Sequence, residues 1–524
     1  MANADTDDKI FVGKAAKPQY LSLNLANRHG LVTGATGTGK TVTLQTIAEG
    51  FSRAGVPVFA ADIKGDLSGV SQEGQGKDWV VKRCKEIDVK YEAEQFPVVF
   101  WDLFGEQGHP IRATVSEMGP LLLSRMMNLN DTQEGVLNIA FRVADENGLP
   151  ILDLKDLRAM LGFIADNAAD LTKTYGNVSS ASVGAIQRQL LVLENQKGEK
   201  FFGEPALDIN DLMKKTGGKG NINLLAADKL MQNPRLYGTF LLWLLSEMFE
   251  ELPEIGDPDK PKLVFFFDEA HLLFDEAPKV LLEKIEQVVR LIRSKGVGVY
   301  FVTQNPADVP ETVLAQLGNR VQHALRAYTP NEQKAVKVAA QSFRPNPKLN
   351  TERVITELGK GEALTSFLEG NGVPAMVDRT LIRPPAGDVG AITDAQRKAV
   401  IAKSPVKGKY DEAVDNESAY EILQKKTDLK TRNAGQQQGD SEDQQSGSVL
   451  GGIGDLIGGI FGTNRKRGER LTTGQKVARE VTRSVTSRIG GAVAGGLGKK
   501  IGGSMGNTIG RAILRGALGG ILRR

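Results

Sequence analysis

A phosphate-binding motif near the N-terminus constrains this chain more than any other stretch. Residues 34–41 read Gly-Ala-Thr-Gly-Thr-Gly-Lys-Thr and match the pattern G-x-x-x-x-G-K-[ST] at every fixed position. Glycines let the backbone turn tightly enough to aim its N–H groups at phosphate oxygens, and a helix that starts near Lys40 adds its positive dipole end. An apolar stretch over 29–33 precedes the motif and an amphipathic one over 42–51 follows it. This strand–loop–helix setting predicts a nucleoside triphosphate site.

The side chains of the motif predict how ATP and Mg²⁺ are held. Lys40 is expected to reach the β- and γ-phosphates as a positive charge, and the Thr41 hydroxyl is expected to ligate Mg²⁺. The residues expected to contact the nucleotide are Gly34, Ala35, Thr36, Gly37, Thr38, Gly39, Lys40, Thr41 and Val42.

A second motif supplies the carboxylates that such a site needs. Residues 263–267 form an apolar run, expected as a buried strand, which ends in Asp268 and Glu269 in the form of a Walker B element. We expect Asp268 to hold the Mg²⁺ shell and Glu269 to polarise the attacking water as general base. His271 follows, and a packing or hydrogen-bonding role suits it as well as a coupling one.

Two further strand ends carry polar side chains. Residues 297–303 predict a buried strand that ends at Gln304, whose amide would sense the γ-phosphate or orient water, or would simply terminate the strand. Residues 56–62 predict another strand, which ends at Asp62 with Lys64 two residues on. Because ligands of parallel α/β sheets sit outside the carboxyl ends of strands, both residues are expected near the nucleotide; capping a turn is the equal alternative.

The 524 residues are too many for one core, so we expect several segments. Residues 97–102, 321–325 and 374–383 predict more strands, and residues 359–364 predict a turn that leads into a short strand. Helical periodicity dominates 114–250. The expected fold is α/β, a RecA-like P-loop NTPase with a mainly parallel sheet. Its expected segments are the first core part (1–113), a helical insertion (114–255), the second core part (256–386), a helical extension (387–432), a flexible linker (433–448) and a Gly-rich basic tail (449–524).

Charge is distributed unevenly along the chain. From Arg465 onward, 14 Lys and Arg face two Glu, so this tail carries +12 and the remaining residues carry −9 of the overall +3. A basic tail on an acidic body indicates contact with a polyanion, either nucleic acid or a membrane surface. The single cysteine, Cys84, excludes an internal disulfide framework, and the acidic N-terminus lacks a signal peptide's apolar core. A cytoplasmic location without transmembrane helices is expected.

The tail also carries a repeat. An apolar residue recurs at nearly every fourth position from 477 to 521, and small residues recur beside it from 490 to 510. A four-residue spacing drifts about 40° per step on a 3.6-residue helix, so paired helices packing on glycine faces fit better than one straight helix. Self-association, a protein partner and an anionic membrane surface are the candidate contacts of residues 449–524; a disordered basic tail is the alternative. Nucleic-acid binding also stays open, although the tail from Arg465 has no Phe, Tyr or Trp to stack on bases.

Four blocks in this order resemble the HerA–FtsK superfamily of hexameric pumping ATPases, and most closely the bacterial HerA-like (YjgR-like) group. They are residues 26–41, residues 61–67 (Ala-Asp-Ile-Lys-Gly-Asp-Leu), residues 268–271 (Asp-Glu-Ala-His) and residues 298–306 (Gly-Val-Tyr-Phe-Val-Thr-Gln-Asn-Pro). The resemblance spans residues 10–430. It implies a hexameric ring with ATP at subunit interfaces.

The resemblance also implies that one subunit donates an arginine to its neighbour's γ-phosphate. Matched by motif, Arg320 in Gly-Asn-Arg-Val (318–321) is the first candidate and Arg293 the second. HerA helicases carry an N-terminal β-barrel that holds a nuclease partner. Because the phosphate loop here already begins at Gly34, we do not expect that partnership.

Two functional hypotheses follow from these features. In the first, an Mg²⁺-dependent ATPase ring moves DNA through its pore, with translocase or helicase-like activity. In the second, ATP drives an assembly or switch factor that the tail directs to a membrane or protein partner. A scaffold that does not hydrolyse nucleotide is disfavoured, because Lys40, Thr41, Asp268, Glu269 and Gln304 are all present.

Overall fold

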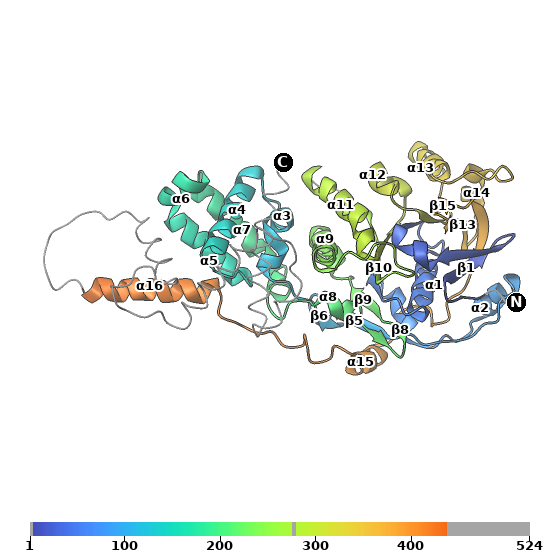
Figure 1. The fold of residues 1–524 in the computed structure, drawn as a ribbon, viewed down its shortest axis with the longest axis horizontal. Helices are drawn as coiled ribbons and strands as arrows, with labels where there is room; N and C mark the ends of the chain where they lie inside the picture. The colour runs from blue at the N-terminus through green and yellow to red at the C-terminus, as the bar shows by residue number, and fades with distance from the viewer. Residues whose placement is uncertain (1–3, 275–278, 437–524) are drawn as a thin grey trace. The chain divides into compact units, whose positions relative to one another are not determined.

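The computed structural model describes residues 4–274 and 279–436, and these residues divide into two compact units. The sheet unit comprises Met1–Ile111 and Leu207–Glu412. The helical unit comprises Arg112–Ala206 and the described residues from Ala413 onward. Figure 1 labels the elements of both units.

The sheet unit is built on a 12-stranded sheet with the order β2-β1-β16-β13-β12-β3-β11-β10-β4-β9-β5-β6. All neighbours from β12 to β6 are parallel, whereas β13, β16, β1 and β2 pair antiparallel. The mostly parallel α/β fold is therefore confirmed. The strands are β1 (Lys9–Lys14), β2 (Pro18–Ser22), β3 (Gly30–Thr33), β4 (Val58–Asp62), β5 (Val98–Asp102), β6 (His109–Pro110), β9 (Ile222–Ala226), β10 (Leu263–Phe267), β11 (Val297–Thr303), β12 (Asn319–Gln322), β13 (Glu362–Ser366) and β16 (Asp378–Ile382).

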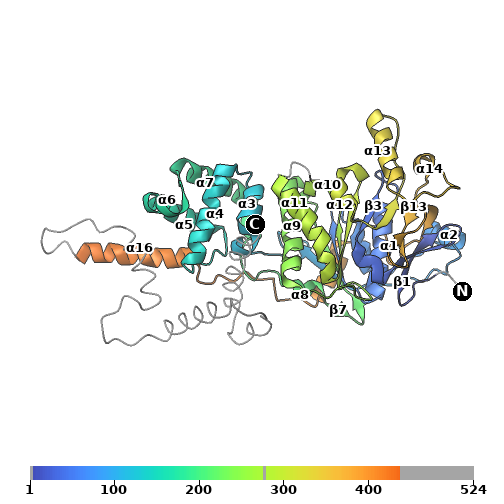
Figure 2. The same ribbon diagram turned by 45° about the horizontal axis from the view of Figure 1, so that its top comes forward.

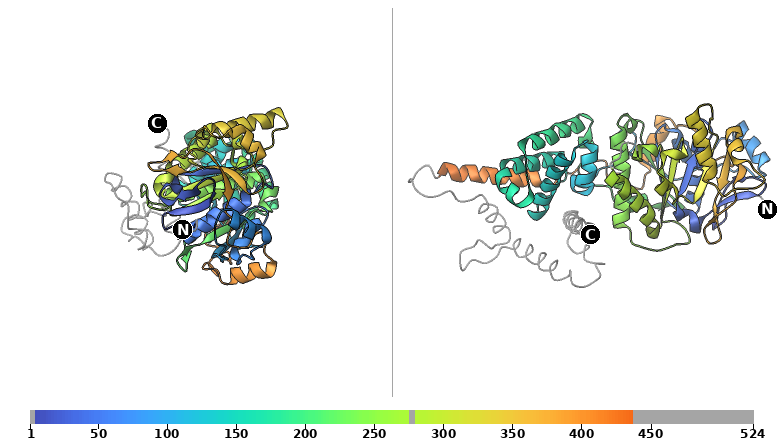
Figure 3. Two further views of the ribbon diagram at one scale, coloured as in Figure 1. Left: turned by 90° about the vertical axis from the view of Figure 1, so that its right-hand side faces the viewer. Right: turned by 90° about the horizontal axis from the view of Figure 1, so that it is seen from above.

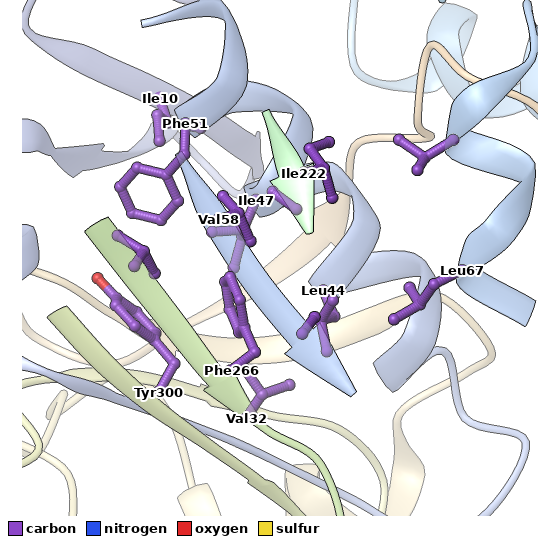
Figure 4. Packing of buried hydrophobic residues seen from close by; sticks show 14 of the residues in the cluster. Ile10, Val32, Leu44, Ile47, Phe51, Val58, Leu67, Ile222, Phe266 and Tyr300 are labelled. Carbon is purple, nitrogen blue, oxygen red and sulfur yellow. The ribbon is translucent and has the colours of Figure 1, made fainter. Parts of the chain in front are cut away.

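The central strands are buried along their whole length because both faces of the sheet are covered. Every residue of β3, β4, β10 and β11 is buried. Helix α1 (Lys40–Arg53) packs on one face, where Leu44, Ile47 and Phe51 meet Val32 and Phe266 from the strands (Figure 4).

The opposite face of the sheet is largely aromatic. Phe265 stacks on Phe59 with ring centroids 4.7 Å apart, and Phe267 stacks on Phe301 at 5.3 Å. The Phe274 ring of α10 (His271–Phe274) lies against the Phe301 ring, with centroids 5.7 Å apart. Helix α10 packs against α9 (Pro234–Glu251), which in turn packs against α11 (Lys279–Ile292), as Figure 2 shows.

Shorter elements complete the sheet unit. They are α2 (Asp78–Glu86), α8 (Ile209–Leu212), α12 (Glu311–Leu314), α13 (Pro330–Gln341), α14 (Thr351–Glu357), α15 (Asp394–Ala402), and the hairpins β7 (Lys215–Thr216) with β8 (Lys219–Gly220) and β14 (Leu368–Glu369) with β15 (Val373–Pro374).

The helical unit is a bundle of amphipathic helices (Figure 3). Helices α4, α5 and α7 pack on one another, and α16 packs along α5. Capping boxes at Thr114, Asn130 and Asp153 start α3, α4 and α5. The helices are α3 (Val115–Met126), α4 (Asp131–Glu146), α5 (Leu154–Asp166), α6 (Ala168–Tyr175), α7 (Ser180–Asn195) and α16 (Ala419–Gln436). Within the described ranges, no helix combines the length and apolar composition needed to cross a membrane.

The segment boundaries differ from those expected. The helical insertion predicted for 114–255 ends at Ala206, because β9 returns to the sheet between β4 and β5 and α9 belongs to the sheet unit. The extension predicted for 387–432 is divided, with α15 in the sheet unit and α16 in the helical unit. Residues 433–436 of the predicted linker belong to α16; residues 437–448 and the tail over 449–524 lie outside the described residues.

Candidate nucleotide-binding site

Three polar chain segments leave the sheet at the carboxyl ends of β3, β10 and β11. The register places Thr303 opposite Thr33 and Phe301 opposite Phe267. The phosphate loop follows Thr33, Asp268 follows Phe267, and Gln304 follows Thr303. The structure therefore brings together, at one sheet edge, the phosphate loop, the acidic pair and the glutamine that the sequence singled out.

The loop between β3 and α1 has a backbone that only glycine adopts readily. Gly39, at the start of α1, has φ 117°. A Cβ on Gly34 would lie 2.5 Å from the Cβ of His323, so this position has no space for a side chain. Beyond Gly37, by contrast, a Cβ would meet nothing within 4 Å. The loop is therefore closely packed against the protein at Gly34 and has open space beside it at Gly37.

His323, which directly follows β12, is the main support of this loop. Its Nδ1 donates to the Glu362 carbonyl at 2.8 Å, so its Nε2 accepts from the Thr43 hydroxyl of α1 at 2.9 Å. Burial lowers the pKa of His323 to about 4, so the ring is neutral at pH 7 and keeps this tautomer. Backbone bonds from Ala35 to Ala324 and from Gly361 to Thr38 hold the loop at both ends. No motif marks His323 in the sequence; a lone histidine within the strand expected over 321–325 is its only signal.

Charges at the sheet edge are coupled. Burial lowers the pKa of Lys40, against the attraction of Glu269 and Asp268. The Lys40 ammonium donates to the Gly34 carbonyl at 2.6 Å and to the Ala35 carbonyl at 3.2 Å, inside the curl of the loop. Burial, reinforced by the charge of Glu269, raises the pKa of Asp268 to about 7. A positive charge placed beside this carboxyl group would stabilise its ionised form.

Gln304 bridges the loop and the acidic pair. Its Nε2 lies 3.4 Å from Glu269 Oε1, and its Oε1 lies 3.4 Å from the Thr36 hydroxyl. His271 Nδ1 lies 3.4 Å from the other carboxylate oxygen of Glu269. That oxygen is buried and accepts no hydrogen bond within the described residues. An unsatisfied buried carboxylate oxygen beside a phosphate loop is suited to accept a proton or to hold a water.

The residues present fit an Mg²⁺–nucleoside triphosphate. The glycine loop leaves open space where phosphates need to approach, and α1 directs its N-terminus toward that space. The Thr41 hydroxyl, exposed at the first turn of α1, and the Asp268 carboxylate are the hard oxygen donors that Mg²⁺ prefers. Among the described residues, no group of three or more His, Cys, Asp or Glu is arranged to hold a metal alone. A site with few protein ligands is typical of Mg²⁺ bound together with phosphates.

Asp62 and Lys64 line a cavity of about 200 Å³ at the carboxyl ends of β4, β9 and β5. Burial raises the pKa of Asp62 to about 6. The charge of Asp62 acts on the pKa of Asp268 and the charge of Lys64 on the pKa of Lys40, so both residues lie within electrostatic range of the candidate site. Arg397 of α15 lies in the same cavity with its guanidinium 4.3 Å from the centroid of the Phe100 ring.

The two candidate arginines occupy different surroundings. The Arg320 guanidinium donates to the carbonyls of Leu317, Leu314 and Ser342, and burial lowers its pKa. Arg293 lies just before β11, at the sheet edge opposite the phosphate loop, and pairs with the exposed Asp257 at 2.7 Å. The Arg320 guanidinium is therefore hydrogen-bonded within its own chain, whereas Arg293 makes a surface ion pair.

The mostly parallel sheet and the phosphate loop facing an Asp–Glu pair at its carboxyl edge define a P-loop ATPase. The model of the family described as "Helicase HerA-like C-terminal" matches residues 7–524, and the chain belongs to this family. The resemblance drawn from the four sequence blocks is thereby confirmed.

Comparison with solved structures finds chains of low sequence identity and partial structural similarity. The bacterial conjugative coupling protein TrwBdeltaN70, in its unbound monoclinic form, is 17% identical over 72% of this chain and 92% of that chain, with a TM-score of 0.48. VirB4 of Thermoanaerobacter pseudethanolicus is 14% identical over 72% of this chain and 98% of that chain, also with a TM-score of 0.48. The plasmid coupling protein TrwB in complex with ADP and Mg²⁺ is 16% identical over 72% and 91%, with a TM-score of 0.47. A search of curated proteins finds no match.

Proposed function

We propose that this chain is an Mg²⁺-dependent ATPase that works as a ring and couples hydrolysis to the movement of DNA. The observation that carries the ATPase part is Gln304, which contacts both the phosphate loop at Thr36 and the carboxylate of Glu269. A glutamine that contacts both the phosphate loop and the Glu269 carboxylate is suited to align an attacking water with the γ-phosphate.

In this proposal each residue has one task. Lys40 neutralises charge on the β- and γ-phosphates, and Thr41 with Asp268 holds Mg²⁺, which supplies charge neutralisation at the phosphates. Glu269 takes the proton of the attacking water, and Gln304 orients that water or detects the γ-phosphate. The backbone of residues 34–42 wraps the phosphates.

The ring part of the proposal needs an arginine from a neighbouring subunit, and Arg293 suits it better than Arg320. Arg293 is 37% exposed and lies at the sheet edge opposite its own site, where a neighbour in a ring would be reached. Its ion pair with the exposed Asp257 is a surface pair and costs little to break.

The DNA part rests on the helicase name of the family and is the part that most needs a test. We would measure ATP hydrolysis by the full chain with and without double- and single-stranded DNA at two salt concentrations. Several-fold stimulation at low salt that fades at high salt, and that survives deletion of residues 449–524, is expected of a translocase. Hydrolysis indifferent to DNA would instead favour the assembly factor, which the +12 charge of the tail supports.

The catalytic assignment has its own test. Glu269→Gln keeps the size of the side chain and removes the base, so turnover is expected to fall by about 10²-fold or more while nucleotide binding persists. Glu283→Gln, which neutralises an exposed carboxylate of α11, is the matched control. Equal turnover in wild type and Glu269→Gln would exclude Glu269 as the base.

A further inference from the structure

Helix α9 sends a buried tyrosine to the turn that carries the acidic pair. Tyr237 lies in the first turns of α9, whose N-cap is Asn233, and is 0% exposed. Its hydroxyl donates to the backbone carbonyl of Asp268 at 2.9 Å. Burial, reinforced by the charges of Asp268 and Glu269, raises the pKa of Tyr237 well above its usual range, so the hydroxyl remains a donor at neutral pH.

The bonded carbonyl belongs to the peptide between the two carboxylate residues. The other polar end of that peptide, the Glu269 N–H, donates to Asp268 Oδ1 at 3.0 Å. Both ends of one peptide group are therefore fixed, one by a side chain from α9 and one by the carboxylate proposed for Mg²⁺. The orientation of this peptide sets the direction in which the next residue leaves the turn.

That next residue is Glu269, and its backbone is strained. Its φ is 48°, in the left-handed region that side chains other than Gly, Asn and Asp rarely adopt. Such a conformation costs about 1–3 kcal/mol and persists only where surrounding contacts hold it. One such contact follows directly, since the Ala270 N–H donates to the Val302 carbonyl at 3.0 Å. On the N-terminal side of Glu269, the Tyr237 hydroxyl holds the peptide group that joins it to Asp268.

We propose that Tyr237 is a positioning residue for Glu269, holding the Asp268–Glu269 peptide so that the Glu269 carboxylate faces the phosphate loop. The inference deepens the proposed ATPase function and rests on it. It makes α9 part of the machinery that sets turnover, through a tyrosine whose hydroxyl is bonded to the backbone of the acidic pair.

The test is Tyr237→Phe, which removes one hydroxyl and keeps the ring. Turnover is expected to fall about ten- to a hundredfold, as a base displaced by a fraction of an ångström would cause. KM and the affinity for a non-hydrolysable ATP analogue are expected to stay within about twofold, because the phosphate loop is untouched. A merely structural tyrosine would not separate kcat from KM in this way.

Tyr300→Phe is the matched control. Tyr300 lies in β11, is 2% exposed, and donates its hydroxyl to the Ala26 carbonyl at 3.0 Å, so its chemistry is the same. The two variants are expected to lose similar melting temperature, while only Tyr237→Phe loses turnover. An equal loss of turnover in both variants would show a general effect of destabilisation and would overturn the inference.

A double-mutant cycle decides whether Tyr237 acts through Glu269. If it does, Tyr237→Phe causes no further loss of turnover in a Glu269→Gln background. An additive loss, unchanged turnover in Tyr237→Phe, or a joint loss of turnover and nucleotide affinity would each overturn the inference. An inactive wild-type chain would remove the proposed ATPase function and this inference with it, so the two failures are distinguishable.

Discussion

Asp268 lies in surroundings that favour the protonated form of its carboxyl group. Burial in the sheet edge and the adjacent negative charge of Glu269 raise its pKa to about 7, whereas the charge of Lys40 acts in the opposite direction. The residue is therefore prepared to lose its proton when a cation arrives. Its neighbour Glu269 has one buried carboxylate oxygen that accepts no hydrogen bond within the described residues.

Asp268→Asn is expected to change how stability depends on pH. An acid whose pKa is raised on folding binds its proton more tightly in the folded chain, so this contribution is present at low pH and is lost as pH rises toward 7. Relative to wild type without Mg²⁺, the variant should gain about 1–3 kcal/mol between pH 5 and pH 8, after discounting for partial exposure. Urea unfolding at the two pH values measures it; a difference independent of pH would contradict the raised pKa.

Helix α1 and the phosphate loop are held by a network that crosses from β12 to β13. His323 accepts from Thr43 and donates to Glu362, so it connects α1 with the antiparallel part of the sheet. Gln322 accepts the Thr33 hydroxyl at the end of β3. The loop and the start of α1 are therefore supported by side chains from the strands beside them.

Thr43→Val tests this network at constant side-chain volume. It leaves His323 Nε2 buried without a donor, so we expect a stability loss of about 1–2 kcal/mol and a several-fold loss of nucleotide affinity. Thr46→Val is the control, because Thr46 lies on the same helix, is 0% exposed and donates instead to the Arg383 carbonyl. Melting curves should move similarly for both variants, with nucleotide affinity reduced only by Thr43→Val. Equal affinities would show that the loop does not depend on His323.

The phosphate loop and Arg293, which we propose to meet between neighbouring subunits, lie at opposite ends of the parallel strands. The phosphate loop lies at the carboxyl ends of the parallel strands, and Arg293 precedes β11 at their amino ends. A head-to-tail ring places one such edge against the other between successive subunits. Arg320 does not suit this geometry, since its three hydrogen bonds to carbonyls would have to break first.

Mixing active and inactive subunits tests the ring. If sites cooperate, adding Glu269→Gln chains to wild type should lower turnover faster than in proportion to the inactive fraction. Arg293→Ala alone should abolish most turnover, and Arg290→Ala, an exposed arginine one turn earlier on α11, should not. A strictly proportional decline would indicate independent subunits.

The predictable parts of the fold are those where local chemistry leaves little choice. The phosphate loop needs glycines at fixed positions, and β10 and β11 are buried on both faces, so their sequences are continuous apolar runs. The sequence predicts a helical insertion that continues to 255, whereas β9 returns to the sheet at Ile222. The sequence of β9 is not a continuous apolar run, because its second residue is Asn223. Asn223 is buried; it accepts from Trp101 Nε1 and donates to the Val58 and Leu212 carbonyls, which other segments of the chain supply.

Local composition was therefore enough to identify the phosphate loop, the acidic pair, the glutamine and the class of fold, because each is defined by neighbours in the chain. Other features depend on contacts between distant segments. The Tyr237 hydroxyl bonds to the Asp268 carbonyl 31 positions away, and His323 bonds to Thr43 280 positions away. Hydrogen bonds between distant segments leave no periodicity or motif in a single sequence, so only the tertiary structure decided which polar side chains support the site.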